Sequence, residues 1–209
     1  MPGIPFRRLV DSFVAQLERL SATVIRANDR DDVRPARMRV LTGGAAPTDC
    51  LVFLWAVTPG GRNRPTNERR VQATGLRRRT IPLVPGTRTL LGGWNEEHGV
   101  FAFWDPRRHV EFGLRASNSL QVTDETLAAA QRMGIATQVR PSRMGSEVVV
   151  AVAPDSLLWY VQNGLPLHNT DEDATAVPML VDASTEEEAQ FIDESQNEGQ
   201  TVRRFDLVE

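Results

Sequence analysis

Residues 50–57 read CLVFLWAV, a fully apolar run that predicts a buried strand. A Pro-Gly-Gly turn at 59–61 ends the run. Shorter alternating or apolar segments predict further strands at 37–42, 69–74, 87–91, 99–104 and 147–152. The glycine-containing stretch between 92 and 99 predicts a hairpin. The middle of the chain is therefore expected to be rich in short strands.

Helical patterns flank this β-rich body. In residues 5–28, apolar side chains recur every three or four positions, which predicts an amphipathic helix that packs on the core or on a partner helix. Thr123 or Asp124 is placed to cap a second helix that ends at Gly134, and a third is expected at 156–163. Because helices and strands do not alternate, the sequence predicts an α+β fold. We expect a curved, mostly antiparallel sheet or a partly closed β-barrel, flanked by helices.

Charge divides the chain into two parts. Residues 1–170 hold 22 arginines and 15 acidic residues, a net charge of +7, whereas residues 171–209 hold 2 arginines and 12 acidic residues, a net charge of −10. This asymmetry predicts a basic binding domain at 1–168 and an acidic connector at 169–209, with one short helix at 186–194. The connector is either a solvated linker or a segment that folds over the basic face as a DNA mimic.

Composition excludes several classes of protein. All 24 basic residues are arginine, so a P-loop, a protein-kinase core and Schiff-base chemistry are excluded. The single cysteine, Cys50, excludes an internal disulfide and is expected to be buried. No apolar stretch approaches the length of a membrane span, and no signal peptide is apparent. A cytoplasmic protein that uses no cofactor and contacts no membrane is expected.

Arginine clusters between residues 62 and 79, where seven of the 24 lie. The stretch from 62 to 115 combines 11 arginines with tryptophan and phenylalanine, and such a mixture suits phosphate neutralisation and base stacking. A solvated basic face is the alternative. The expected DNA contacts are Arg62, Arg64, Asn67, Arg69, Arg70, Arg77, Arg78, Arg79, Arg107 and Arg108.

A second concentration of informative residues lies at 92–112, GGWNEEHGVFAFWDPRRHVEF. A flipped base needs an aromatic wall and polar groups for its Watson–Crick edge, roles that Trp94 or Trp104 and Asp105 could fill. The alternation of Phe101 and Phe103 with Trp104 requires one face to be core. His98 and His109 are a poor metal pattern, and no paired nucleophile and base was found, so neither a metal site nor catalysis is expected.

Four segments together resemble a known family. They are RPTNERRVQATG (64–75), VFAFWDPRRHVEF (100–112), SNSLQVTDETLAAAQRMG (117–134) and EVVVAVAPDSLLWYVQN (147–163). They resemble the N-terminal recognition domains of modification-dependent (type IV) restriction systems, which also occur beside DNA methylases and HNH nucleases. The resemblance covers about residues 35–165.

The resemblance implies a module with an SRA- or PUA-like barrel that reads modified cytosine, most simply 5-methylcytosine, in duplex DNA. Cutting would fall to a separate nuclease domain in the same chain. It places the base pocket among Trp94, Trp104, Asp105, Ser117, Asn118 and Ser119. Two alternatives remain open from the sequence. One is a protein-interaction module that uses the N-terminal helix and the acidic tail, and the other is a metal-dependent enzyme that processes nucleic acid.

Overall fold

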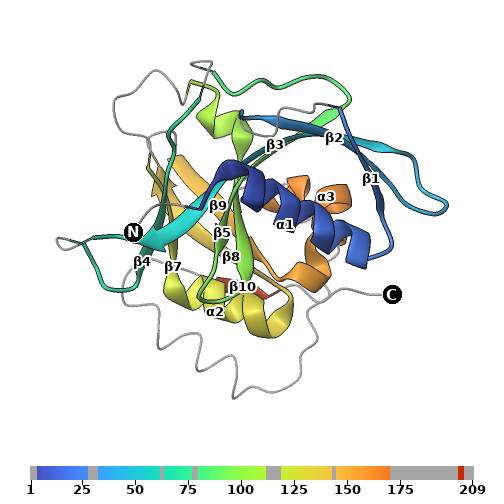
Figure 1. Cartoon of the computed structure of the whole chain (residues 1–209). Coiled ribbons are helices and arrows are strands. Elements are labelled where there is room, and N and C mark those ends of the chain that lie inside the picture. The colour runs from blue at the N-terminus through green and yellow to red at the C-terminus, as the bar shows by residue number, and fades with distance from the viewer. Residues whose placement is uncertain are drawn as a thin grey trace.

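The computed structural model describes residues 4–27, 33–61, 64–76, 80–111, 119–142 and 145–169, together with the backbone at 202–204 (Figure 1). The helices are α1 (Phe6–Arg19), α2 (Asp124–Met133) and α3 (Leu157–Asn163), with short 3-10 turns η1 (Pro106–His109), η3 (Pro154–Ser156) and η4 (Leu165–His168). The strands are β1 (Thr23–Arg26), β2 (Ala36–Leu41), β3 (Thr48–Pro59), β4 (Glu68–Gln72), β5 (Thr87–Asn95), β6 (Val100–Trp104), β7 (Ser119–Thr123), β8 (Ile135–Ser142), β9 (Gly145–Val152) and β10 (Val202–Arg204).

Strand β3, which contains the apolar run, lies inside the sheet. The strand order is β1-β2-β3-β5-β6-β9-β8-β10, and β4 also pairs with the end of β3. Along β3, Val52 and Leu54 belong to one buried cluster, whereas Leu51 and Phe53 belong to the other. Because both faces of the sheet are covered, every side chain of the run is apolar rather than every second one.

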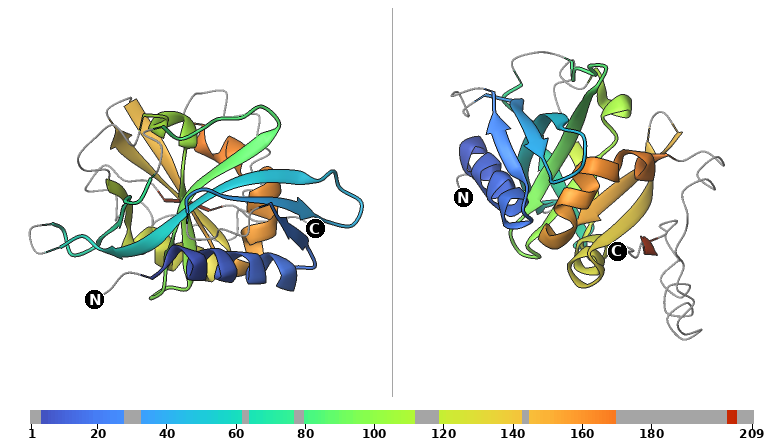
Figure 2. Two further views of the ribbon diagram at one scale, coloured as in Figure 1. Left: turned by 45° about the horizontal axis from the view of Figure 1, so that its top comes forward. Right: turned by 90° about the vertical axis from the view of Figure 1, so that its right-hand side faces the viewer.

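Different elements cover the two faces. On one face, α1 and α3 pack over the sheet, and α1 lies alongside β3 and β1 (Figure 2). On the other face, α2 and the two-stranded ribbon of β4 and β7 complete the second core cluster. Helix α1 presents one apolar stripe to the sheet, made of Phe6, Leu9, Val10, Phe13, Val14 and Leu17.

The predicted α+β class and mostly antiparallel sheet are confirmed, since β3 with β5 is the one parallel pair among the ladders of the described residues. The sheet does not close into a barrel. Strand β7 pairs with β4 through five residue pairs, while β8 pairs with β9 and β10. No backbone ladder joins β7 to β8 within the described ranges, where β10 pairs with β8 and side chains of β8 contact β7.

The N-terminal helix is shorter than the predicted 5–28. It ends at Arg19, Ser21 adopts a positive φ of 64°, and β1 begins at Thr23. Val24 had extended the helical pattern because it packs on the same core, but it does so from a strand. A left-handed residue cannot continue a right-handed helix, so the chain reverses there.

The other predicted helices are confirmed. Helix α2 starts at Asp124, the Thr123 side chain caps it, and Gly134 follows it with φ 86°. Helix α3 ends before Gly164. The hairpin is also confirmed, but Gly92 and Gly93 lie within β5 rather than in the loop. Strands β1, β7 and β8 were not predicted.

The predicted acidic connector lies mostly outside the described residues, as does its expected helix at 186–194. The backbone of β10 pairs antiparallel with β8, so the extended ending TVRRF contributes a strand at 202–204. Among the described helices, none is both long and apolar enough to cross a membrane.

Candidate nucleic-acid interface

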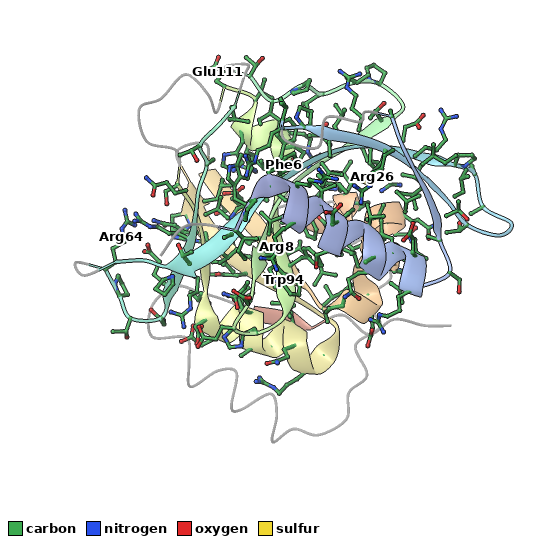
Figure 3. All side chains as sticks on the ribbon, in the orientation of Figure 1. Phe6, Arg8, Arg26, Arg64, Trp94 and Glu111 are labelled. Carbon is green, nitrogen blue, oxygen red and sulfur yellow. The ribbon has the colours of Figure 1, made fainter. Side chains whose placement is uncertain are left out.

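On the segment from β3 to β4, two of the predicted DNA-contact arginines are engaged by carboxylates of the protein itself. Arg64, at the tip between β3 and β4 (Figure 3), pairs with Glu68 at 2.8 Å. The Arg69 side chain is only 12% exposed and pairs with Asp124 at 2.8 Å and with Glu97 at 3.1 Å. These charges are compensated internally, so each would have to exchange a carboxylate for a phosphate in order to bind DNA. Arg62, Arg77, Arg78 and Arg79 lie outside the described residues.

Asn67 and Arg70 differ in whether their side chains have partners within the described part of the protein. The Asn67 side-chain amide donates to Glu125 at 3.2 Å, and the backbone carbonyl of Asn67 accepts from the Asp124 backbone N–H at 2.8 Å, so Asn67 ties the start of β4 to α2. Arg70 is half-buried and forms no ion pair within the described part of the chain. Of the predicted contacts on β4, Arg70 is therefore the one with an uncompensated charge.

Asp105 organises the turn after β6. It is 3% exposed, and its carboxylate accepts from the Arg107 backbone at 2.9 Å and from the Arg107 Nε at 2.8 Å. Arg108 lies at 3.9 Å, and Arg107 also donates to Asn169 at 2.9 Å. Burial raises the pKa of Asp105, but the hydrogen bonds from Arg107 outweigh it and bring that pKa below its ordinary value. Asp105, which was predicted to accept a hydrogen bond from a base, is thus already engaged in the hydrogen bonds that hold η1 in place.

The two tryptophans assigned to one base pocket lie on opposite faces of the sheet. Trp94 is partly buried and packs on Phe101, with ring centroids 4.6 Å apart, on the face covered by α1. Trp104 is 1% exposed in the other cluster, and its indole N–H donates to the Gln121 carbonyl at 3.1 Å. A single pocket cannot use both rings, because the sheet separates them.

Ser119 lies on β7, at the seam with β8. Its hydroxyl is buried and has no hydrogen-bond partner among the described residues. Ser117 and Asn118, which were assigned to the same pocket, lie outside those residues. On β7, Leu120 and Val122 point into the core, so Ser119 and Gln121 share the other side of the strand.

Side chains of β8 bridge this seam. We define the β7–β8 seam by Ser119, Gln121 and Thr123 on β7 and by Gln138 and Arg140 on β8. The Gln138 side-chain carbonyl accepts from the Thr123 backbone at 2.9 Å, and the Arg140 guanidinium donates to the Gln121 side chain. Gln138 is fully buried, yet its Nε2 has no partner in the described structure, and the same holds for Arg140 Nη1. Each such donor carries a desolvation cost.

The charges around the seam are close together. His109 lies 2.6 Å from Glu147, which neighbours Arg140 across the β8–β9 ladder. Burial lowers the pKa of Arg140, while Glu68 and Glu147 raise it and Arg64 lowers it further. Gln138 and Arg140 were missed from the sequence because β8 itself was missed. Their signal was a pair of polar residues on the same strand face as the buried Ala136.

The candidate metal ligands of the hairpin are held in separate pairs. His98 contacts Asp124 at 2.9 Å, whereas His109 contacts Glu147. Among the residues that the structure describes, no group of three His, Cys, Asp or Glu side chains could hold a metal ion.

The fold and site define an α+β domain in which a sheet is covered on both faces and polar side chains of β8 bridge to β7 along one seam. A family model described as methylase-associated X1 matches residues 48–161, from the start of β3 into α3. The chain belongs to this methylase-associated family. No curated protein and no solved structure matched the chain.

Proposed function

We propose that this protein is the DNA-recognition module of a restriction-modification-related system and that it reads a modified base, most simply 5-methylcytosine, in duplex DNA. Its membership of a methylase-associated family supports a role beside DNA-modifying enzymes. The single observation that carries the reading step is the β7–β8 seam, where buried donors of Gln138 and Arg140 have no partner in the described residues.

The chemistry of these donors suits a nucleobase. Glutamine and arginine are side chains that bind base edges, and cytosine offers two acceptors on its Watson–Crick edge, O2 and N3. Only side chains bridge the seam, through Gln138 to the Thr123 backbone and Arg140 to Gln121. Opening it therefore breaks no strand ladder. Trp104, whose indole N–H donates to the Gln121 carbonyl, lies next to the seam and would offer an aromatic surface to a base that entered it.

The rest of the domain supplies phosphate contacts. Residues 1–170 carry a net charge of +7, and Arg70 has no internal carboxylate partner in the described structure. Binding led by phosphate contacts weakens steeply as salt rises. Burial of a 5-methyl group contributes on the order of 0.8 kcal/mol, which is only a few-fold preference. Strong discrimination would thus require rejection of unmodified DNA as well. Cleavage would fall to a separate domain or subunit.

Fluorescence anisotropy tests this proposal. Duplexes with and without 5-methylcytosine are titrated at two salt concentrations against the wild-type protein and the Gln138→Glu and Arg140→Gln variants. We expect salt-sensitive binding that prefers the methylated duplex, and loss of that preference in both variants. Arg132→Gln, a change at the exposed end of α2, is the matched control. Equal binding to both duplexes would contradict the proposed pocket for a modified base. No binding at low salt would refute the proposal as a whole.

A further inference from the structure

Arg34 is held by three contacts that fix its guanidinium without neutralising it. Its Nε donates to the Leu54 carbonyl at 2.9 Å. Its Cζ lies 4.4 Å from the centroid of the Phe6 ring and 4.8 Å from that of Trp55. Rings packed on a guanidinium leave its edge available for in-plane hydrogen bonds. Phe6 stands at the first turn of α1 (Figure 3).

The segment that follows β4 secures this arrangement. The Trp55 indole donates to the Thr74 carbonyl at 2.9 Å, and Arg34 forms an isolated parallel bridge with Leu76. Between them, Gly75 adopts a φ of 73°, and a Cβ built on it would lie 3.4 Å from Arg34 Nη1. The backbone thus approaches the guanidinium closely. Arg77, Arg78 and Arg79 follow Leu76 directly in the sequence.

Arg34 forms no ion pair within the described part of the chain. Arg26, Arg39, Arg64, Arg69 and Arg107 each pair with a carboxylate, but Arg34 pairs with none among the described residues. Neither of its terminal nitrogens forms a hydrogen bond with a described residue, and neither is among the buried side-chain atoms without a partner. They therefore remain accessible to solvent. Burial of the rest of the side chain lowers the pKa of Arg34 to about 10.

We propose that Arg34 is a phosphate-binding residue, with its terminal nitrogens donating to two oxygens of one phosphate group. A guanidinium matches two phosphate oxygens in a planar, bidentate contact, and its fixed position reduces the entropy lost on binding. Arg7 and Arg8 are exposed immediately after Phe6, and neither has an ion-pair partner in the described structure. The net charge of +7 over residues 1–170 favours a phosphate over a singly charged carboxylate.

The phosphate can belong to a DNA backbone or to a free phosphate compound. The first source rests on the proposed function, whereas the second does not. In either case the contact is separate from base reading, because Arg34 lies beside α1 and β3, whereas the seam lies between β7 and β8.

The first experiment measures thermal midpoints in sodium phosphate and in sodium chloride at equal ionic strength. A phosphate dissociation constant of about 10 mM predicts a rise of about 4 °C at 100 mM phosphate. Arg34→Lys and Arg34→Gln should lose this specific rise. Phosphate also stabilises proteins in general, and the rise that remains in these variants measures that general effect. Arg39→Gln is the control, because Arg39 is exposed and pairs with Asp49. An equal rise in all four proteins would overturn the proposal.

A further variant keeps the test informative if the Arg34 variants are destabilised. If both Arg34 variants melt at lower temperature in chloride, Phe6→Leu keeps the arginine while removing one ring. It should retain the fold and show a smaller phosphate response. An unchanged response in Phe6→Leu, together with an unchanged response in whichever Arg34 variant folds, would again refute the site.

The second experiment uses a short duplex in unmodified and methylated forms and identifies the source of the phosphate. If DNA is the source, Arg34→Gln should weaken binding about tenfold, equally for methylated and unmodified duplexes, and reduce the salt slope by about one. If the wild-type protein binds no DNA but keeps its phosphate response, the proposed function fails while the phosphate site stands. Full DNA affinity in Arg34→Lys and Arg34→Gln, without a phosphate response in the wild type, would overturn the site.

Discussion

The hydroxyl of Tyr160 lies 2.7 Å from Nε2 of His168, and both side chains are buried. Nδ1 of the same ring lies 2.8 Å from the Val148 carbonyl, which can only accept. His168 therefore donates through Nδ1, and because burial lowers the pKa of the ring, the ring is neutral and its Nε2 accepts from Tyr160. This chain of hydrogen bonds ties η4 to α3 and β9 at the end of the core domain.

This neutral histidine predicts acid sensitivity. Burial lowers the pKa of His168 below its ordinary value of 6.5. As pH falls through 6.5, the unfolded chain takes up a proton that the folded protein does not, so the free energy of unfolding decreases until the lower folded pKa is reached. Denaturation at several pH values between 5 and 8 should show this loss. His168→Gln should be less stable at pH 8 and should show a weaker dependence on pH, and an identical dependence would contradict the assignment.

Gly93→Ala should destabilise the fold by about 2 kcal/mol or more. A Cβ at this position in β5 would lie 2.6 Å from a methyl group of Val71 and 2.7 Å from one of Val57. Gly43→Ala is a matched control because a Cβ there meets nothing within 4 Å. Urea denaturation compares the two variants. Equal stability would mean that the ribbon of β4 and β7 does not pack on β5 as described.

Trp104→Phe should cost about 2 kcal/mol of stability, because it leaves a cavity and removes the hydrogen bond to the Gln121 carbonyl. Trp94→Phe should cost less than about 1 kcal/mol, since Trp94 is only partly buried and a phenylalanine ring can keep the contact with Phe101. Chemical denaturation measures both. A larger loss in Trp94→Phe would contradict the assignment of Trp104 to the core.

Arg69→Gln should mainly lower the stability of the fold, whereas Arg70→Gln should mainly reduce the salt dependence of DNA binding. The first removes a mostly buried cation that holds Asp124 and Glu97, so stability should fall by about 1–2 kcal/mol, with little change in DNA affinity. The second removes an uncompensated charge, so stability should change by less than about 0.5 kcal/mol, while the salt slope of DNA binding falls by about one. Denaturation and anisotropy at several salt concentrations distinguish them, and the reverse pattern would refute this division.

Local pattern was sufficient for several elements. The apolar run at 50–57 predicted β3, and the cap at Thr123 with the stop at Gly134 predicted α2, because these signals depend on residues close together in the chain. The end of α1 was misplaced because Val24 continued the helical spacing from within β1. Strand β8 was missed because the polar Gln138 and Arg140 interrupt its apolar face.

The candidate site was less predictable. Arginine clustering drew attention to β4, but it could not distinguish Arg69, which two carboxylates neutralise, from Arg70. The sequence did not single out Arg34, because nothing near it in the chain places it between Phe6 and Trp55. Phe6 lies 28 positions before it and Trp55 lies 21 positions after it.

The sequence by itself determined the α+β class, the positions of the main strands and two helices, and the contrast between a basic body and an acidic extension. These properties follow from composition and from periodicity along the chain. Only the tertiary structure decided which face of the sheet each tryptophan occupies, which arginines are neutralised, and where buried donors lack partners. Such properties depend on contacts between residues far apart in the sequence, and those contacts are fixed by how the sheet is covered on its two faces.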